Sequence, residues 1–153
     1  MNQSEVLMKI RQETGLGVMD IKKALDEAGG DEQKALKLLK NKRESIVAKK
    51  QERTAGQGLI ETYTHQGRIG VMIEVNCETD FVARNEDFID FVHNLVLQIS
   101  SMCPQNVNEL LKQESVKDST QTVEQLLTAI TAKMGEKVVI SRFVRWEIGE
   151  MTV

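Results

Sequence analysis

The chain has 153 residues, with 20 lysines and arginines against 23 aspartates and glutamates, and a formal net charge of −3 at pH 7. This length supports a real core without disulfides or metals, and the 41% hydrophobic share excludes wholesale disorder. The near-neutral balance excludes a general nucleic-acid coat, which needs net positive charge to displace counterions.

The charge changes sign along the chain, which predicts two units. Residues 1–55 hold 12 basic and 9 acidic side chains, whereas residues 56–153 hold 8 and 14. The polar segment at residues 51–58 lacks large apolar side chains and contains two glycines. We therefore predict a helical module at residues 1–50, a linker at 51–58 and a second domain at residues 59–150.

Apolar spacing predicts three short helices in the first unit. Residues 4–13 form the first helix, with Ser4 as its cap, and the glycines within residues 14–17 end it. The second begins with Asp20 as its cap and ends at the glycine pair 29–30, because glycine tolerates a left-handed cap.

The third helix of this unit is predicted to start after a cap at Asp31. Its buried side is expected to be Ala35, Leu38 and Leu39. A further helix over residues 44–53 carries basic side chains and leads into the linker. Short helices bury little surface, so we expect a small compact bundle.

The second unit changes to a period of two. Apolar residues alternate between 69 and 75, which predicts a strand with one buried face. Residues 59–65 precede it, and Gln66-Gly67 stands where a hairpin turn is expected. Residues 137–148 are rich in β-branched and aromatic side chains, which predicts a third strand.

Two helices accompany these strands. Helical spacing of apolar residues runs over about residues 86–102, where Pro104 ends it, and over residues 122–134, where Gly135 ends it. The predicted fold class is therefore α+β, with a three-stranded antiparallel sheet and helices packed on one face.

Motifs for catalysis or metal binding are not found. Gly15-Leu16-Gly17 has no preceding strand and no third glycine, so it indicates a helix-breaking turn rather than a nucleotide cradle. His65, Cys77, His93 and Cys103 match no zinc spacing. The two cysteines favour a reducing compartment in which both stay free.

The carboxylates of Glu78 and Asp80 are two positions apart, which is commonplace and indicates no acid–base pair. We predict a protein that is not an enzyme and that needs no metal or cofactor. We also predict neither direct nucleotide binding nor a membrane span. The first six residues do not have the pattern of a secretory signal.

Two apolar features admit two interpretations each. Val18-Met19 lies between glycines and a helix start, where it forms either a buried staple or an exposed contact for a partner. Phe81 lies on a short turn after the strand. Packing into the core is the default expectation for a phenylalanine, and the alternative is an interface anchor.

Three runs of sequence resemble the translation elongation factor Ts family. The first is TGLGVMDIKKAL at residues 14–25, and the second is EVNCETDFVARN at residues 74–85. The third, KVVISRFVRWE at residues 137–147, resembles the closing strand of the family. The resemblance spans about residues 6–102 and resumes over residues 123–149. It implies a three-helix module like a ubiquitin-associated domain, followed by an α+β dimerisation-type core.

The resemblance implies a guanine-nucleotide exchange factor for the GTPase elongation factor Tu. In the family, the Asp-Phe of the second run enters between helices of the GTPase domain and disturbs its Mg²⁺ site, which promotes GDP release. Matched to this sequence, these residues are Asp80 and Phe81. The positions expected to shape the turn are Thr79, Arg84 and Asn85. Val18 and Met19 are expected to contact the same GTPase domain.

This chain departs from the resembled family between Pro104 and Gln121, where longer members insert further helices. Short members compensate by forming dimers, so a homodimer is expected. A cytoplasmic location is expected, or the stroma or matrix of an organelle if an organelle encodes the chain.

Two rival functions remain open from the sequence. One is RNA binding through the basic helix at residues 37–50, whose cationic side chains are Lys37, Lys40, Lys42, Arg43, Lys49 and Lys50. The other is a ubiquitin-type recognition module formed by the first fifty residues, which leaves residues 56–153 without a role.

Overall fold

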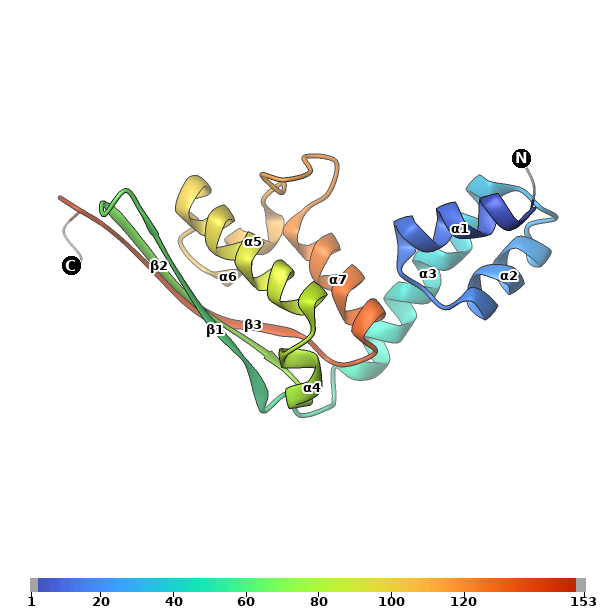
Figure 1. Ribbon diagram of the computed structural model, residues 1–153, viewed down its shortest axis with the longest axis horizontal. Coiled ribbons are helices and arrows are strands. Elements are labelled where there is room, and N and C mark those ends of the chain that lie inside the picture. The colour runs from blue at the N-terminus through green and yellow to red at the C-terminus, as the bar shows by residue number, and fades with distance from the viewer. Residues whose placement is uncertain (1–2, 151–153) are drawn as a thin grey trace.

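The structure, a computed structural model, describes residues 3–150, so residues 1–2 of the predicted helical module lie outside the described residues. Within this range the chain is α+β, as predicted (Figure 1). In chain order the elements are α1 (Gln3–Thr14), α2 (Val18–Glu27), α3 (Glu32–Lys50), β1 (Gln57–His65), β2 (Ile69–Cys77), α4 (Asp80–Ala83), α5 (Glu86–Met102), α6 (Val107–Lys112), α7 (Val123–Met134) and β3 (Val139–Glu147).

The helical unit, α1 to α3, lies at one end of the molecule (Figure 1). Gly15 ends α1 with a left-handed φ of 66°, and the Asp31 side chain caps α3 by accepting a hydrogen bond from the Lys34 N–H at 3.1 Å. The unit has its own buried cluster, which consists of Ile10, Leu16, Ile21, Ala24, Leu25, Ala35 and Leu39.

The starts of α1 and α2 differ from the sequence prediction. Ser4 lies inside α1 rather than capping it. α2 begins at Val18, two residues before Asp20, because Gly17 is the N-cap in extended conformation. Asp20 therefore lies in the first turn, where its carboxylate receives the Lys42 ammonium at 2.6 Å.

α3 runs unbroken from Glu32 to Lys50, so the separate helix predicted over residues 44–53 is wrong. The apolar stripe that marks the start of α3 stops after Leu39, and its second half is held by packing against α7. Leu38 is 38% exposed, contrary to expectation, because the buried side of α3 follows Ala35 and Leu39.

The sheet is antiparallel in the order β1-β2-β3, with β2 in the centre. Gln66 and Gly67 form the predicted hairpin turn, both with positive φ. Alternate residues of β2 are buried at Val71, Ile73 and Val75, which confirms the predicted period of two. β1 begins at Gln57, inside the segment interpreted as a linker.

α5 and α7 cover one face of this sheet (Figure 1). α5 spans the predicted residues 86–102 and begins after Asn85, whose side chain accepts the Asp87 N–H at 2.9 Å. α7 begins with a capping box between Thr122 and Gln125 and ends at Gly135, which has a φ of 72°.

α6 lies in the polar segment between Pro104 and Gln121, where the sequence pattern indicates no helix. Its six residues bury only Leu110, so no periodicity is visible. The loop that follows is held by the buried amide of Gln98, which donates to the Glu114 carbonyl at 3.0 Å and accepts the Val116 N–H at 2.8 Å.

No element within residues 3–150 covers the other face of the sheet, which carries large exposed apolar side chains. They come from all three strands and are Ile60, Met72, Val144 and Trp146. Among them, Arg142 donates to Glu74 at 2.7 Å. This bond, followed by one from Asn76, lowers the pKa of the Glu74 carboxyl.

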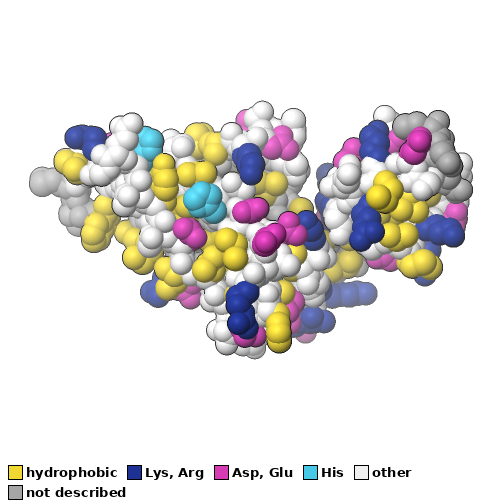
Figure 2. Space-filling model, viewed as in Figure 1, with side chains coloured by type: hydrophobic (Ala, Val, Ile, Leu, Met, Phe, Trp, Pro, Cys, Tyr) yellow, Lys and Arg dark blue, Asp and Glu magenta, His cyan; other side chains and the backbone are white. Residues whose placement is uncertain are grey.

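The helical unit meets the rest of the chain where α3 packs on α7. Lys137 Nζ donates to the Gln51 carbonyl at 2.5 Å, and Gly15 lies against the Lys133 side chain. Figure 2 shows the surface hollowed between the two units. No helix within residues 3–150 has both the length and the apolarity needed to cross a membrane.

Candidate partner-binding site

The second of the family-like runs forms the connection between β2 and α5. Thr79 is the N-cap of α4, and its side-chain oxygen accepts the Val82 N–H. Asn85 separates α4 from α5 and caps the latter. Caps on both sides therefore define a single helical turn, which lies at the end of the sheet nearest the helical unit (Figure 1).

Phe81 is 79% exposed, so the default expectation that it packs into the core is wrong. In one helical turn, neighbouring side chains point in different directions. Val82 and Ala83 fasten the turn by packing against the main hydrophobic cluster, the buried core of the sheet unit that includes Val75, Phe88 and Val92. Phe81 is left on the outer side, since the two inward positions are already filled.

Charged groups orient the exposed side of the turn. Arg84 forms an ion pair with Asp80 and also donates to the Asp80 carbonyl at 3.2 Å. The Arg84 guanidinium lies 5.9 Å from the centre of the Phe81 ring, within cation–π range. The three residues thus form one exposed group of mixed charge and apolar character.

Glu136, which the sequence analysis does not single out, holds the base of this turn. Its carboxylate accepts the Glu78 N–H at 3.1 Å, the Thr79 N–H at 3.0 Å and the Thr79 hydroxyl at 2.7 Å. In return, Glu78 accepts the Lys137 N–H at 2.6 Å. In the sequence, the one signal for Glu136 is that an acidic residue directly follows the glycine that ends α7, and this signal is weak.

A buried thiol lies beneath the same turn. The Cys77 side chain is fully buried and donates from Sγ to the Thr79 carbonyl at 3.1 Å. Burial raises the pKa of the Cys77 thiol, and the neighbouring Glu136 carboxylate adds to the rise. The thiol is therefore neutral at pH 7, and both cysteines are free, as predicted.

Val18 and Met19 form the exposed start of α2, with exposed fractions of 38% and 67%. Their exposure favours the partner-contact interpretation over the buried staple. They belong to the helical unit, whereas Phe81 belongs to the sheet unit, so the predicted site residues form two separate exposed apolar groups (Figure 1).

The basic side chains of α3 are partly used within the chain. Lys42 pairs with Asp20, and Arg43 donates to the Thr14 carbonyl. Burial lowers the pKa of Arg43, and burial followed by the charge of Arg53 lowers that of Lys50. Because Lys42 and Arg43 are engaged within the chain, the basic residues of α3 do not form a uniform cationic surface.

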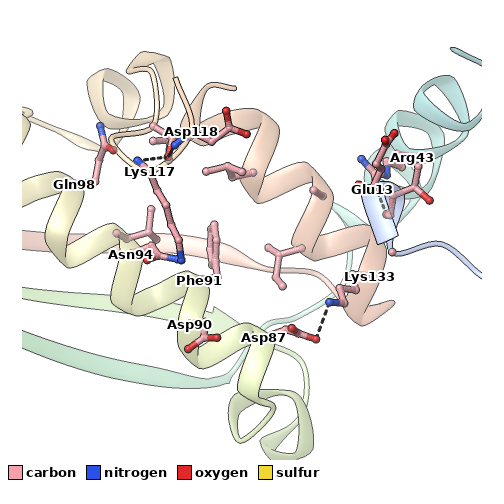
Figure 3. Close-up of a pocket in the computed structure, with 18 of the residues that line it drawn as sticks. Glu13, Arg43, Asp87, Asp90, Phe91, Asn94, Gln98, Lys117, Asp118 and Lys133 are labelled. Atoms are coloured by element: carbon pink, nitrogen blue, oxygen red, sulfur yellow. Dashed lines mark hydrogen bonds and ion pairs between the residues drawn. The ribbon is translucent and has the colours of Figure 1, made fainter. Parts of the chain in front are cut away.

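A groove of about 310 Å³ lies between α5, α7 and the end of α1 (Figure 3). Its floor includes Phe91 and Ile130, and its rim carries both signs, with Lys133 paired to Asp87 at 2.8 Å. Within residues 3–150, no group of three or more histidine, cysteine or acidic side chains is placed to hold a metal ion.

Comparison with known proteins identifies the family. A family model described as Elongation factor TS matches residues 78–153. The protein "Elongation factor Ts" of Moorella thermoacetica is 40% identical over an alignment of 187 positions, gaps included. The alignment covers 92% of this chain and 92% of the relative. The chain belongs to the elongation factor Ts family. Membership implies the nucleotide-exchange role of an elongation factor in protein biosynthesis.

Relatives in the elongation factor Ts family differ in length. The Desulforamulus reducens protein is 38% identical over 193 residues, covering 96% of this chain and 89% of the relative. The Clostridium kluyveri protein is 43% identical over 148 residues, covering 96% of this chain but only 48% of the relative. The alignments to the shorter relatives exceed 153 positions, so even these proteins contain residues without a counterpart here.

Proposed function

We propose that this chain is a guanine-nucleotide exchange factor for elongation factor Tu and acts by inserting Asp80 and Phe81 between helices of the GTPase domain. The insertion disturbs the Mg²⁺ site of the GTPase, and GDP leaves. The observation that carries this proposal is the 79% exposure of Phe81 on a turn that is fastened on its other side. With this function the chain would act beside the translation machinery, in the cytoplasm or in the stroma or matrix of an organelle that encodes it.

An exposed phenylalanine on a fixed turn suits insertion for two reasons. Burying the ring in a partner contributes about 1.5–3 kcal/mol through the hydrophobic effect. The turn is already ordered by its caps, so binding costs little further conformational entropy.

The exchange itself follows from linkage. A partner that prefers the nucleotide-poor conformation weakens GDP binding by the same factor by which GDP weakens the partner. A thousandfold change requires a coupling free energy of about 4 kcal/mol. One phenylalanine ring supplies less than this, so a second contact is needed. We assign that second contact to Val18 and Met19. At the first contact, Thr79, Arg84 and Asn85 shape the turn that carries Phe81.

Release of labelled GDP from elongation factor Tu tests the proposal. We expect the release rate to rise with the concentration of this chain and to saturate. An unchanged rate at all concentrations would show that the chain is not an exchange factor. A matched titration with RNA at two salt concentrations tests the rival function, since phosphate binding weakens steeply with salt.

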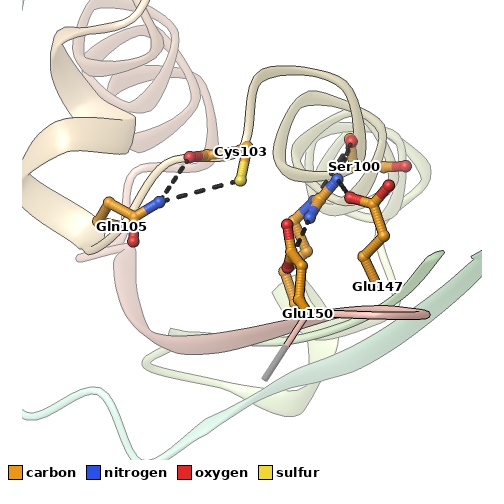
Figure 4. Close-up of polar contacts among 6 residues, drawn as sticks. Ser100, Cys103, Gln105, Glu147 and Glu150 are labelled. Atoms are coloured by element: carbon orange, nitrogen blue, oxygen red, sulfur yellow. Dashed lines mark hydrogen bonds and ion pairs between the residues drawn. The ribbon is translucent and has the colours of Figure 1, made fainter. Parts of the chain in front are cut away.

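We further propose that two copies of this chain pair through the uncovered face of the sheet. The same apolar side chains appear on both copies, as an interface with twofold symmetry requires. Figure 4 shows the polar contacts at this end of β3, where Glu147 lies close to Ser100. The neighbouring Arg145 turns inward, donating to Glu147 at 2.7 Å and to the Ser100 carbonyl at 3.4 Å. Alternation then directs Trp146 to the open face.

Replacing Trp146 by glutamate is expected to dissociate the dimer. Trp146 is 68% exposed, and removing a tryptophan that an interface buries weakens binding by about 30-fold or more. Light scattering across a dilution series measures the change. The control, Val116→Glu, introduces the same charge at an exposed apolar residue outside the sheet. A wild-type chain that is monomeric at every concentration would contradict the pairing.

A further inference from the structure

Glu136 lies 55 residues after Phe81 in the chain, yet it makes the densest set of hydrogen bonds at the base of the turn that carries Phe81. One carboxylate receives two backbone N–H groups and one hydroxyl. Three donors converging on an ionised acceptor form charge-assisted bonds, which are shorter and stronger than neutral ones. The Glu136 side chain therefore ties the start of α4 to the end of α7.

The contact between the start of α4 and the end of α7 is reciprocal, so the two segments cannot shift past each other without breaking hydrogen bonds on both sides. Glu136 binds the backbone before α4, and Glu78 binds the backbone N–H of Lys137 at 2.6 Å. Arg53 adds its guanidinium 3.6 Å from the Glu78 carboxylate. The two crossing carboxylates join the start of α4 to the chain between α7 and β3.

The same residues connect the turn to the helical unit. Lys137 Nζ donates to the Gln51 carbonyl just after α3, and Arg53 follows two residues later. Gly135 permits this arrangement, because its left-handed backbone reverses the chain at the end of α7 and brings Glu136 under the turn.

We propose that Glu136 is a positioning residue for nucleotide exchange. It holds the start of α4 in the one orientation that presents Asp80 and Phe81 to the GTPase. This inference rests on the proposed function of Phe81. Glu136 itself does not contact the partner; it acts through Thr79 and the backbone of the turn.

The test is a titration of GDP release with the Glu136→Gln chain. Glutamine keeps the size of the side chain but replaces one accepting oxygen by a donor, so it cannot receive all three donors. We expect the maximal release rate to fall at least about tenfold, the factor that corresponds to one lost hydrogen bond to a charged group. A loss of folded protein alone would raise the half-saturating concentration and leave the maximal rate unchanged.

Two comparisons make the test specific. Glu124→Gln changes an exposed glutamate on α7 in the same way and is expected to behave like wild type. In the Phe81→Ala background, Glu136→Gln is expected to have a smaller effect on the maximal rate, because Asp80 is then the only one of the two residues that the turn still presents. Equal losses in both backgrounds, or a Glu136→Gln chain that matches Glu124→Gln, would overturn the inference.

Amide hydrogen exchange provides a measurement that does not involve the partner. The N–H groups of Val82 and Arg84 lie in or beside α4 and do not bond to Glu136. We expect both to exchange faster in Glu136→Gln than in Glu124→Gln, and unchanged protection would refute the positioning role. Glu136→Gln could lose this protection while Phe81→Ala leaves GDP release unchanged. That result would contradict the assignment of Phe81 but would still show that Glu136 holds α4 in place.

Discussion

Replacing Phe81 by alanine is expected to lower the stimulated rate of GDP release by about 10- to 100-fold, the loss that corresponds to 1.5–3 kcal/mol for burying one ring. The melting temperature should stay the same, because the Phe81 ring is 79% exposed and supports little of the core. Stopped-flow measurement of labelled GDP on elongation factor Tu gives the rate, and calorimetry gives the melting temperature.

Ile89→Ala is the control for this experiment, since Ile89 is a partly exposed apolar residue on the neighbouring helix. It should leave exchange unchanged. Wild-type rates for Phe81→Ala would remove Phe81 from the mechanism. Adding Met19→Ala to Phe81→Ala should lower the remaining stimulation further, because the second contact then also loses its most exposed side chain.

Replacing Phe88 by alanine is expected to have the opposite consequence. Phe88 is fully buried and lies in the main hydrophobic cluster beneath the sheet. Its removal should reduce the free energy of unfolding by about 3–5 kcal/mol, since a large cavity forms in a packed core. Urea denaturation followed by circular dichroism measures this loss.

Among folded molecules, the Phe88→Ala chain should still stimulate GDP release at a saturating concentration. A change below 1 kcal/mol in unfolding free energy would mean that the site repacks around the missing ring. Phe81 and Phe88 are seven residues apart in the chain, yet replacing the first is expected to affect GDP release and replacing the second to affect the free energy of unfolding.

The sequence predicts the sheet unit most accurately, because several signals agree there. α5 combines helical spacing with an Asn85 cap and a proline after its end, and its bounds are as predicted. α7 has a threonine cap at one end and Gly135 at the other. The hairpin between β1 and β2 follows from the alternation of β2 and from Gly67.

The failures arise where local signals are weak or where distant contacts decide. α6 is too short to show a period, and the loop that follows it is held by the distant Gln98 side chain. α3 continues past its apolar stripe because α7 supports it. Phe81 was expected inside on residue type alone, and only the positions of Val82 and Ala83 turn it outward.

The candidate site shows the same division. The turn, its Thr79 and Asn85 caps and the Asp80-Phe81 pair are adjacent in sequence, so a short run identifies them. Glu136 is not adjacent: its bond to Thr79 spans 57 positions, and a single sequence contains no record of that pairing. Residues that present a site are thus easier to find than those that hold it in place.

The unbroken course of α3 also determines how far apart the two apolar contacts can be. A helix of 19 residues is about 28 Å long at 1.5 Å per residue, and it does not bend easily. It runs from the helical unit that bears Met19 to the base of the sheet unit that bears Phe81. The length of α3 therefore sets the separation between the exposed side chains of Met19 and Phe81. Under the proposed function, the GTPase must bind Met19 and Phe81 at this separation, and a surface that binds only one of them is expected to be bound weakly.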